Sequence, residues 1–186
     1  MRAAIETFHA HGVGVSTAKV ADAAGVSNGT LFNYFPTKQA LIDALYLSIK
    51  TDLAGAIGSP DPELSIEARG RELWEAWRRW ARANRPAHSV MNLLHHSGLA
   101  SAAVQIEAAE LFGASMQVLV EANELGTLVP LPLDYLAALI GQQLDHAITA
   151  ELDDSQSAVA FDVLWNGITN SPDQRALGAK RKKAPL

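Results

Sequence analysis

The amino-acid sequence predicts an all-α fold, and three observations lead to this prediction. Alanine, leucine and other strong helix formers dominate the chain. Apolar residues recur at spacings of three and four, which gathers them on one face of a helix, and no stretch keeps the alternation of a strand for long. The chain has 186 residues, of which 48% are hydrophobic, so it can bury a core in one or two small domains.

The first third of the chain carries clear signals for where helices begin and end. Serine and threonine are favoured N-caps, glycine ends helices, and proline cannot continue them. The predicted helices, with the residues that begin or end them, are about 2–11 (ended by Gly12), 17–24 (capped by Ser16, ended by Gly25), 28–35 (capped by Ser27, stopped by Pro36) and 38–56 (capped by Thr37).

Turn residues gather from Gly58 to Pro62, which is the clearest boundary along the chain. The helices predicted beyond this boundary cover about 64–83, 86–96, 100–124, 133–152 and 155–169. Residues 172–186 contain the run Ala179-Lys180-Arg181-Lys182-Lys183 and no apolar periodicity. We therefore predict that these last residues form a disordered basic tail.

Composition narrows the class of protein. The chain has no cysteine, which excludes disulfides and thiolate metal sites and is compatible with a reducing cytoplasm. No apolar run reaches the ~18–20 residues that a membrane span needs. The first ten residues lack the layout of a signal peptide, because charged side chains interrupt their apolar positions. We expect a cytoplasmic protein.

The net charge of −5 is unevenly distributed. Residues 1–50 carry four bases and three acids, whereas residues 51–172 carry six bases and sixteen acids. Residues 173–186 carry five bases and one acid. Local charge governs contact with a polyanion, so an acidic whole chain does not exclude nucleic-acid binding by its N-terminal segment.

The segment 16–41 has the pattern of a helix-turn-helix. Two short predicted helices are joined by Ala24-Gly25-Val26-Ser27, in which glycine adopts backbone angles that cost other residues energy. We expect Ala21 and Ala24 to let the helices cross closely, and Val26 to plug the turn. In this motif the second helix presents its N-terminal residues to the major groove of DNA.

The same segment contains, in order, Val20-Ala21, Ala24-Gly25-Val26-Ser27, Gly29-Thr30-Leu31-Phe32, Tyr34-Phe35, and Lys38 with Leu41. These pieces resemble the signature of the TetR family of bacterial transcription repressors, and they match its order and spacing without a gap over about 25 residues. Gly126-Thr127-Leu128 also resembles a recurrent feature of the family's C-terminal half. The remainder is similar only in the number and order of helices.

Two departures from the family weaken the expected grip on DNA. Phe32 stands where tyrosine is common, so one hydroxyl contact is missing. Met1 falls inside the first helix, whereas family members usually carry several further residues, often basic, before it. Such residues supply phosphate contacts, so we expect their absence to lower affinity.

The motif contains residues suited to both kinds of DNA contact. Thr17, Tyr34 and Lys38 suit the phosphate backbone, which positions a protein without reading sequence. Base reading falls to Ser27, Asn28, Thr30 and Asn33, with Gly29 permitting close approach of the DNA. The asparagines suit this role because an asparagine side chain can bond two atoms of adenine.

Each of these residues also has a simpler possible role. Ser27 and Thr37 can be helix caps only, Asn28 and Asn33 can be solvated side chains, Tyr34 can belong to the core, and Lys38 can be an ordinary surface lysine. We expect Leu31 and Phe35 to face inward.

The later helices suggest a ligand site, although aromatic residues at helical spacing are also typical of ordinary core. Trp74, Trp77 and Trp80 fall within about 120° of one helix face at ~100° per residue. Further apolar and polar residues on neighbouring predicted helices complete the set expected to bind a small-molecule effector: Met91, His95, Phe112 and Met116. His88, Asn92 and His95 share a face, but no carboxylate stands at matching spacing, so we predict no metal site and no cofactor.

The last two helices have apolar faces. By resemblance to the family, they pair with their copies in a second subunit as a four-helix bundle, and two-fold symmetry suits a palindromic operator. The residues expected at this interface, each with intramolecular core as the alternative, are Leu136, Ile140, Leu144, Phe161 and Trp165.

The sequence thus predicts a helix-turn-helix DNA-binding domain over residues 1–50 and a helical effector-binding and dimerisation domain over 51–171. The expected function is that of a homodimeric repressor whose binding to double-stranded operator DNA responds to a small molecule. No nucleotide-binding loop, zinc-protease motif or nucleophile elbow is present, so we expect no enzyme. A helical dimer that senses ligands or binds proteins without binding DNA is the alternative.

Overall fold

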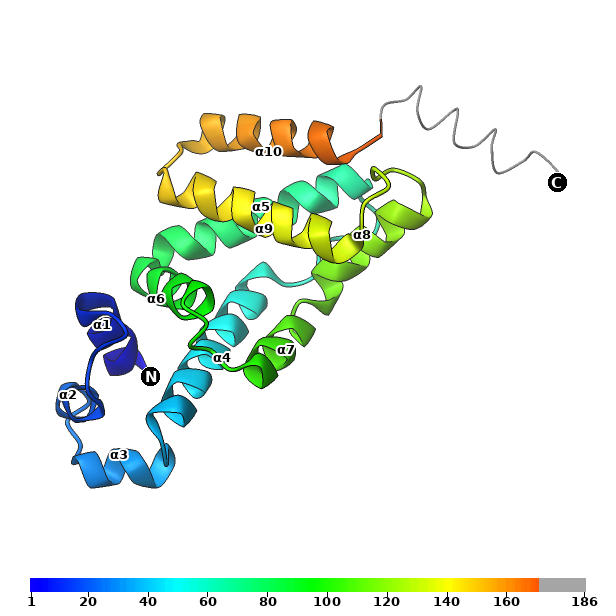
Figure 1. The fold of residues 1–186 in the computed structure, drawn as a ribbon. Helices are drawn as coiled ribbons and strands as arrows, with labels where there is room; N and C mark the ends of the chain where they lie inside the picture. Colours follow the sequence, from blue (N-terminus) through cyan, green and yellow to red (C-terminus); the bar gives the residue numbers. More distant parts are fainter. Residues whose placement is uncertain (171–186) are drawn as a thin grey trace. The chain divides into compact units, whose positions relative to one another are not determined.

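The structure is a computed structural model that describes residues 1–170, so the predicted basic tail at 172–186 lies outside the described residues. These residues form ten α-helices and no strand, which confirms the predicted fold class (Figure 1). The helices are α1 (Arg2–His11), α2 (Thr17–Ala23), α3 (Asn28–Tyr34), α4 (Lys38–Ile57), α5 (Ile66–Ala83), α6 (Arg85–His96), α7 (Ala102–Glu110), α8 (Gly113–Glu124), α9 (Leu133–Thr149) and α10 (Asp154–Ile168).

The helices separate into two compact units. The first unit comprises Met1–Gly58 and Arg79–Phe112, and the second comprises Ser59–Arg78 and the described residues from Gly113 onward. Helices α6 and α7 therefore pack in the same unit as the helix-turn-helix segment. This grouping by contact differs from the functional domains predicted at 1–50 and 51–171, which stay a prediction.

The predicted caps fix the helix starts. The hydroxyl of Ser16 accepts a hydrogen bond from the Lys19 amide at 3.3 Å. The hydroxyls of Ser27 and Thr37 each accept a bond from the amide three residues later at 3.0 Å. Each hydroxyl satisfies one of the amides that the first turn of a helix leaves without an intrahelical partner. The first four helices accordingly begin where the sequence predicts.

The single helix predicted over 100–124 is wrong, because the structure contains two helices there. Helix α7 begins at the Ser101 cap, whose hydroxyl accepts the Val104 amide at 3.3 Å, and it ends at Glu110. Helix α8 begins at Gly113, a poor residue for the interior of a continuous helix. Apolar spacing continues across this junction, so periodicity alone does not reveal the break.

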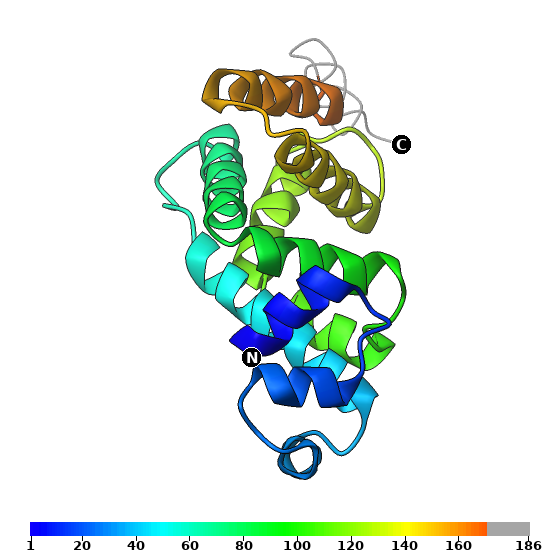
Figure 2. The same cartoon turned by 90° about the vertical axis from the view of Figure 1, so that its left-hand side faces the viewer.

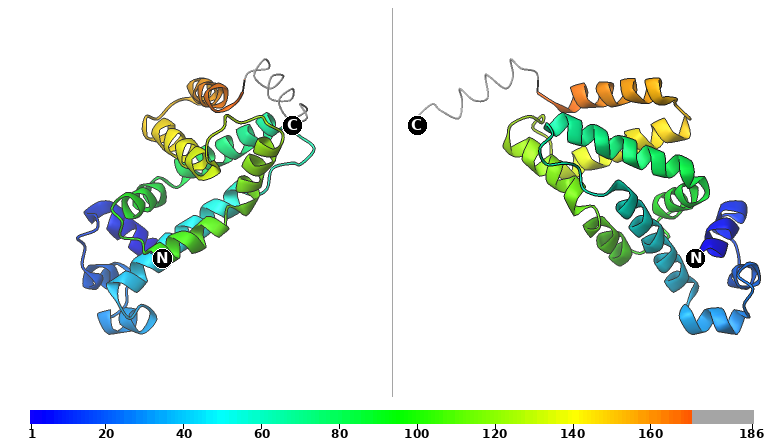
Figure 3. Two further views of the ribbon diagram at one scale, coloured as in Figure 1. Left: turned by 45° about the vertical axis from the view of Figure 1, so that its right-hand side comes forward. Right: turned by 180° about the vertical axis from the view of Figure 1, so that it is seen from behind.

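The core of the first unit is centred on α4. Its buried stripe repeats at three- and four-residue spacing, and it packs against α6 and α7. Figure 3 shows α4 and α7 running side by side. Helix α1 packs against α6 and α2, and its Phe8 side chain is buried. The most buried members of the α4 stripe are Leu41, Leu45, Ile49 and Leu53.

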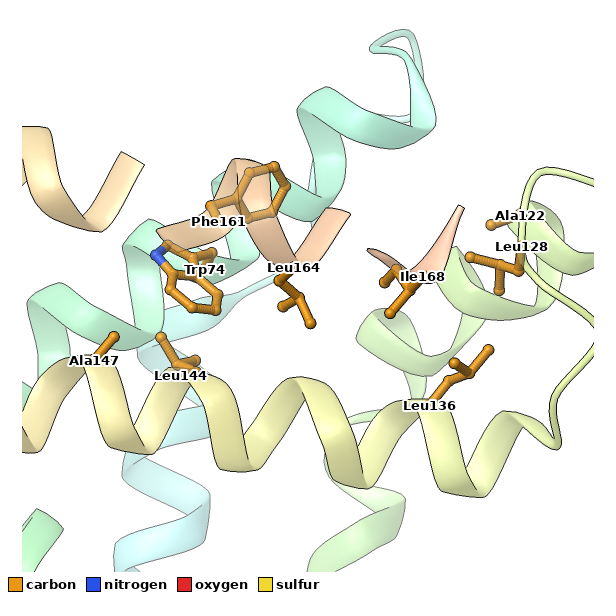
Figure 4. Packing of buried hydrophobic residues seen from close by; sticks show 9 residues of the cluster. All are labelled: Trp74, Ala122, Leu128, Leu136, Leu144, Ala147, Phe161, Leu164 and Ile168. Atoms are coloured by element: carbon orange, nitrogen blue, oxygen red, sulfur yellow. The ribbon is translucent and has the colours of Figure 1, made fainter. Parts of the chain in front are cut away.

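The core of the second unit joins α5, α8, α9 and α10 (Figure 4). Trp74 reaches into it from α5, and the Phe161 ring meets the indole edge-on with ring centroids 5.8 Å apart. The indole N–H of Trp74 donates to the Ser157 hydroxyl at 2.9 Å, and both side chains are buried. The buried cluster consists of Trp74, Ala122, Leu128, Leu136, Leu144, Ala147, Phe161, Leu164 and Ile168.

Two arginines of α5 form ion pairs with aspartates of α10 at the edge of this core. Arg71 pairs with Asp162 of α10 at 2.6 Å, and its guanidinium lies 4.3 Å from the centre of the Phe161 ring. Arg78 pairs with Asp154 in the first turn of α10 at 2.7 Å. These pairs and the tryptophan hydrogen bond set the rotation of α5 against α10.

The segment Gly126-Thr127-Leu128 closes the second unit. Leu128 and Thr169 form an isolated antiparallel bridge. The Val129 amide donates to the Ile168 carbonyl at 2.9 Å, and the Asn170 amide donates to the Thr127 carbonyl at 2.8 Å. The connection between α8 and α9 is thereby fastened to the end of α10. The sequence marks this segment by resemblance alone, whereas the structure gives it a mechanical role.

We expect Ser157→Ala to lower the free energy of unfolding by about 1–3 kcal/mol, because the buried indole N–H of Trp74 loses its acceptor. Urea unfolding monitored by tryptophan fluorescence, at fixed protein concentration, measures this change. Ser155→Ala, on the exposed side of the same helix, is the control and should change stability by less than about 0.5 kcal/mol. Equal stability of the two variants would contradict the role given to this hydrogen bond.

Candidate nucleic-acid interface and ligand-binding residues

The turn between α2 and α3 has the geometry that its glycine predicts. Gly25 has a φ of +70°, in the left-handed region that favours glycine. The Val26 amide donates to the Ala21 carbonyl at 3.0 Å, which closes the turn. Ala21 is fully buried where the two helices approach each other. The close crossing predicted for this residue is therefore present.

Two predictions about the turn are wrong. Val26 is 38% exposed and does not plug the turn, and Ala24 is also exposed. Val20 and Leu31, one from each helix, are the buried apolar side chains beside Ala21. Val26 instead lies on the exposed surface directly after Gly25, with its amide bonded to the Ala21 carbonyl.

Helix α3 is anchored through one side and exposed on the others. Leu31 is buried and Phe35 is half-buried, so both face inward as predicted. Tyr34 is 77% exposed, and Asn28 and Asn33 are exposed as well. Figure 2 shows α3 nearly end-on at the lower edge of the first unit. Tyr34 therefore does not belong to the core.

The remaining candidates of the motif lie on or near the same helix. Gly29 is exposed, Thr17 is half-buried at the start of α2, and Thr30 is half-buried on α3. The hydroxyls of Ser27 and Thr30 lie 2.9 Å apart and share a hydrogen bond. Ser27 also caps α3, because its hydroxyl accepts a hydrogen bond from the Thr30 amide. This capping role does not prevent a contact with DNA. The exposed Phe32 ring adds apolar surface to this face.

Lys38 does more than the sequence predicts. Its ammonium donates to the carbonyls of Val13 and Val15, at 2.9 and 2.8 Å. The side chain thus ties the loop after α1 to the first turn of α4. An ammonium has three donors, so these two bonds do not use all of its hydrogen-bonding capacity. Sequence reasoning misses the tie because the partners lie more than twenty residues away and are backbone atoms.

The predicted ligand residues are divided between the two units. Trp74, Trp77 and Met116 belong to the second unit, while Trp80, Met91, His95 and Phe112 belong to the first. Trp74 and Met91 are buried core residues. The Trp80 indole is buried and donates to the Asp52 carboxylate at 2.7 Å. Regular aromatic spacing on α5 therefore reports mainly on packing.

The remaining predicted ligand residues keep accessible surface. Met116 and His95 are exposed, and Trp77 and Phe112 are half-buried. His95 and Phe112 also belong to a polar and aromatic cluster that sequence reasoning misses, together with Tyr46 and Lys50 of α4. The Tyr46 hydroxyl and His95 Nδ1 lie 3.3 Å apart, and their rings stack. The Lys50 ammonium lies 5.6 Å from the centre of the Tyr46 ring and 5.2 Å from that of Phe112.

Burial changes the ionisation of this cluster. It lowers the pKa of the Lys50 ammonium to about 8. It also lowers the pKa of His95, and the charges of Lys50 and His96 lower that pKa further. It raises the pKa of the Tyr46 hydroxyl. The only sequence signal for the cluster is the four-residue spacing of Tyr46 and Lys50 along one helix.

The predicted interface residues prove to be largely internal. Leu136, Leu144 and Phe161 are buried within their own chain, so the structure gives them a core role. Ile140 and Trp165 are half-buried and pack against the same core. The apolar period of each helix therefore identifies the face that packs against the core of its own chain.

A metal site and a membrane-spanning helix are both absent from the described residues. Within residues 1–170, no three histidine, aspartate or glutamate side chains are grouped so that they could hold a metal ion. None of the helices in this range has the length and apolar character needed to cross a membrane. The exposed α3 surface and the Tyr46–Lys50–His95–Phe112 cluster therefore remain the features to explain.

Comparison with known proteins agrees with this architecture. Residues 1–45 match the family model of the bacterial regulatory proteins, tetR family. The fold is similar to that of a tetR-family transcription regulator from Shewanella sp. PV-4, with 26% identity and a TM-score of 0.84 over 91% of this chain and 96% of that one. It is also similar to a regulator of the same family from Marinobacter aquaeolei VT8, with 19% identity and a TM-score of 0.82 over 91% and 93% of the two chains.

The matched segment includes the turn at Gly25, the exposed helix α3 and the first turns of α4. The structural match extends over both units, because it covers nine-tenths of the chain. Residues 1–45 of this chain are thus similar to the bacterial regulatory proteins of the tetR family, and its fold is similar to that of a transcription regulator of that family.

Proposed function

We propose that the chain is a homodimeric repressor that binds a palindromic operator through α3 and releases it when a small molecule binds. The observation that supports this proposal is that α3 is anchored on one side and exposes polar side chains on the other. The helix is anchored by Leu31, whereas its exposed side displays amide and phenol groups. A helix that served packing alone would not need to leave its aromatic and amide side chains in water. We propose that the protein acts in the cytoplasm and catalyses no reaction.

Base reading is assigned to the exposed side of α3. Asn28 and Asn33 can each make two hydrogen bonds to an adenine edge, and the hydroxyls of Ser27 and Thr30 can bond to either kind of base. Gly29 supports close approach of DNA. A Cβ added there would meet only the Ser27 hydroxyl, at an ordinary 3.8 Å, so packing within the chain does not require glycine.

Backbone contacts are assigned to Thr17, Tyr34 and Lys38. The phenol of Tyr34 extends from the end of α3 and can donate to a phosphate oxygen. Lys38 combines its tie to the α1–α2 loop with a positive charge at the start of α4. Such contacts hold the recognition helix in register and make binding dependent on salt.

Dimerisation is assigned to the outer faces of α9 and α10. Val159 and Val163 are one turn apart on α10, and both are exposed. Tyr135 of α9 is exposed as well. Apolar side chains of this size gain by leaving water, and the half-buried Ile140 and Trp165 can contribute their remaining surface. A two-fold dimer presents two copies of α3 to two half-sites.

A ligand can regulate such a dimer by population shift. The effector stabilises whichever arrangement it binds more tightly, and operator affinity follows the spacing of the two recognition helices in that arrangement. Repression relieved by ligand is the family's habit, and we propose it here.

The direct test of this proposal uses fluorescence anisotropy with labelled DNA from upstream of the chain's own gene. A scrambled duplex of equal length is the control. The proposal expects preferential binding to the natural sequence and an affinity that falls steeply between about 50 and 200 mM salt. Equal and weak binding to both duplexes, at every promoter tested around the gene, would exclude a repressor of this locus.

We expect Asn33→Ala to reduce discrimination between the operator and single-base variants of it. The loss of two hydrogen bonds to one base corresponds to about 1–3 kcal/mol, or roughly ten- to hundredfold in relative affinity at that position. Competition binding against a panel of operator variants measures the change. Asn123→Ala, an exposed asparagine of α8, is the control. An unaltered preference at every position would remove Asn33 from the base-reading set.

We expect Lys38→Ala to act on both stability and DNA binding. Loss of two hydrogen bonds to carbonyls lowers the melting temperature, and loss of a phosphate contact weakens binding to all sequences alike. Differential scanning fluorimetry and anisotropy at several salt concentrations separate the two effects. The exposed Lys19→Ala should leave the melting temperature unchanged. Unchanged affinity and salt slope for Lys38→Ala would show that Lys38 only ties the loop.

We expect Val163→Asp to convert the dimer into a monomer, because it places a charge in the proposed apolar interface. Sedimentation velocity over a range of concentrations measures the state of assembly. Ile106→Asp is a matched control, since Ile106 on α7 and Val163 are both 66% exposed. If both variants stayed dimeric, the interface would lie elsewhere.

A further inference from the structure

The dipeptide Asn-Gly occurs twice in the sequence, as Asn28-Gly29 and as Asn166-Gly167. The amide nitrogen that follows an asparagine can attack the side chain of that asparagine, and glycine in the following position hinders the attack least because it has no Cβ. Asn28-Gly29 begins α3, whereas Asn166-Gly167 lies in the last turn of α10. All four residues are exposed, so the structure holds the same reactive pair in two backbone settings.

The two glycine amides differ in their hydrogen bonding. In the body of α10 each amide donates to the carbonyl four residues earlier, so the Gly167 amide is bound within its helix. The Gly29 amide is one of those at the start of α3 that have no carbonyl four residues earlier in the helix. The Ser27 hydroxyl accepts the Thr30 amide at 3.0 Å, and the Gly29 amide has no acceptor within residues 1–170. The Gly29 nitrogen is therefore available to react.

The start of α3 is also held more weakly than the end of α10. No side chain between the cap of α3 and Leu31 is buried. The end of α10 is held by the buried Ile168 and by the bridge between Thr169 and Leu128. The attack requires rotation of the main chain at the asparagine, so it follows local opening of the turn, and such opening is easiest where few apolar contacts are buried. The packing therefore favours reaction at Asn28.

We propose that Asn28 is a site of spontaneous deamidation and that the acid formed there weakens the binding of α3 to DNA. The Gly29 nitrogen bonds to the Asn28 Cγ, and the bond between Cγ and the side-chain nitrogen breaks. That nitrogen leaves as ammonia, with the proton that the Gly29 amide gives up. Water then adds to either carbonyl of the cyclic succinimide and breaks the bond of that carbonyl to the Gly29 nitrogen. The products are aspartate and isoaspartate, and nothing is oxidised or reduced.

Each product changes the surface that faces DNA in the proposed repressor, so the effect on binding rests on the proposed function. An aspartate carries a negative charge, which phosphates repel, and it has no donor for the edge of a base. Isoaspartate carries the same charge and adds one carbon to the main chain between Ser27 and Thr30, the two partners of the helix cap. Residues 1–50 carry four bases and three acids, so one further acid removes their positive net charge.

Peptide mapping by mass spectrometry tests the chemistry without DNA. The full-length wild-type chain is incubated at mildly alkaline pH, where the amide proton is lost more easily, and is sampled over several days. We expect acid at Asn28 to accumulate at least about tenfold faster than at Asn166, because an opening equilibrium that frees the Gly167 amide in at most about one molecule of ten gives this ratio. Fragmentation of the peptides distinguishes isoaspartate from aspartate.

Gly29→Ala separates this attack from other chemical damage. A Cβ at Gly29 would meet only the Ser27 hydroxyl, at 3.8 Å, and the φ of Gly29 is not in the left-handed region, so the variant should fold. The added methyl group hinders the attack, and we expect acid at Asn28 to form several times more slowly than in the wild type. Acid at Asn166 should form at the wild-type rate in the same samples, which provides an internal control.

Fluorescence anisotropy with the duplex from upstream of the gene tests the consequence. Asn28→Asp reproduces the aspartate product, and Asn123→Asp adds the same charge at an exposed position of α8. We expect Asn28→Asp to bind at least about tenfold more weakly than the wild type, because a pair of hydrogen bonds to a base is lost and the new charge repels phosphates. Asn123→Asp should bind as the wild type does. Incubated wild-type protein should lose affinity in parallel with the fraction converted at Asn28.

The proposal is overturned if acid forms at Asn28 no faster than at Asn166, or if Gly29→Ala leaves the rate at Asn28 unchanged. Equal affinity of Asn28→Asp and the wild type would also overturn it. Because the mapping contains no DNA, its failure is separate from failure of the repressor assignment. If the fresh protein binds upstream and scrambled duplexes equally, the repressor assignment fails. The effect of Asn28→Asp is then measured on the scrambled duplex, since an added negative charge also weakens binding to phosphates alone.

Discussion

Burial of one face of α4 is the constraint on which the rest of the first unit depends. Leu41, Leu45, Ile49 and Leu53 are each almost completely removed from water, and burial of a leucine or isoleucine contributes about 1.5–3 kcal/mol. This stripe fixes the rotation of the helix about its axis. The rotation in turn determines which groups the polar residues on its flanks face. Lys38 is directed to the carbonyls after α1, and Lys50 is directed to the rings of Tyr46 and Phe112. A single packed helix thus positions both a tie to the helix-turn-helix segment and a cation in a partly apolar setting.

The two short helices before α4, in contrast, bury few side chains and expose many. Helix α3 has seven residues and buries only one of them, so its own packing contributes little to stability. Its position depends on the fully buried Ala21, on the turn at Gly25 and on the hydroxyl caps at both of its flanks. This arrangement leaves polar side chains accessible at a defined place. We interpret it as the physical basis of recognition, because a surface that reads DNA must be both exposed and rigidly held.

The sequence predicts the local features well because they depend on neighbouring residues. Caps at Ser16, Ser27 and Thr37, and the positive φ of Gly25, are determined within three or four positions along the chain. The sequence does not predict features that need distant partners. Lys38 finds its acceptors more than twenty residues away, and the break between α7 and α8 interrupts no apolar period. Apolar spacing also cannot distinguish a face that packs within the chain from one that meets a partner. It therefore predicts Leu136, Leu144 and Phe161 at an interface, whereas they are core residues.

In the proposed repressor, the surface of α3 reads a two-fold symmetric DNA site. Hydroxyl-radical footprinting of the wild-type protein on the DNA upstream of its gene tests this most directly. We expect two protected patches related by two-fold symmetry, with centres about 34 Å or a multiple of that distance apart along the helix axis. Protection should disappear in parallel at both patches as salt is raised. The opposite result would be uniform cleavage of the upstream DNA, with no protected patch, at protein concentrations that saturate both this DNA and a scrambled duplex. That result would exclude reading of a specific site by α3.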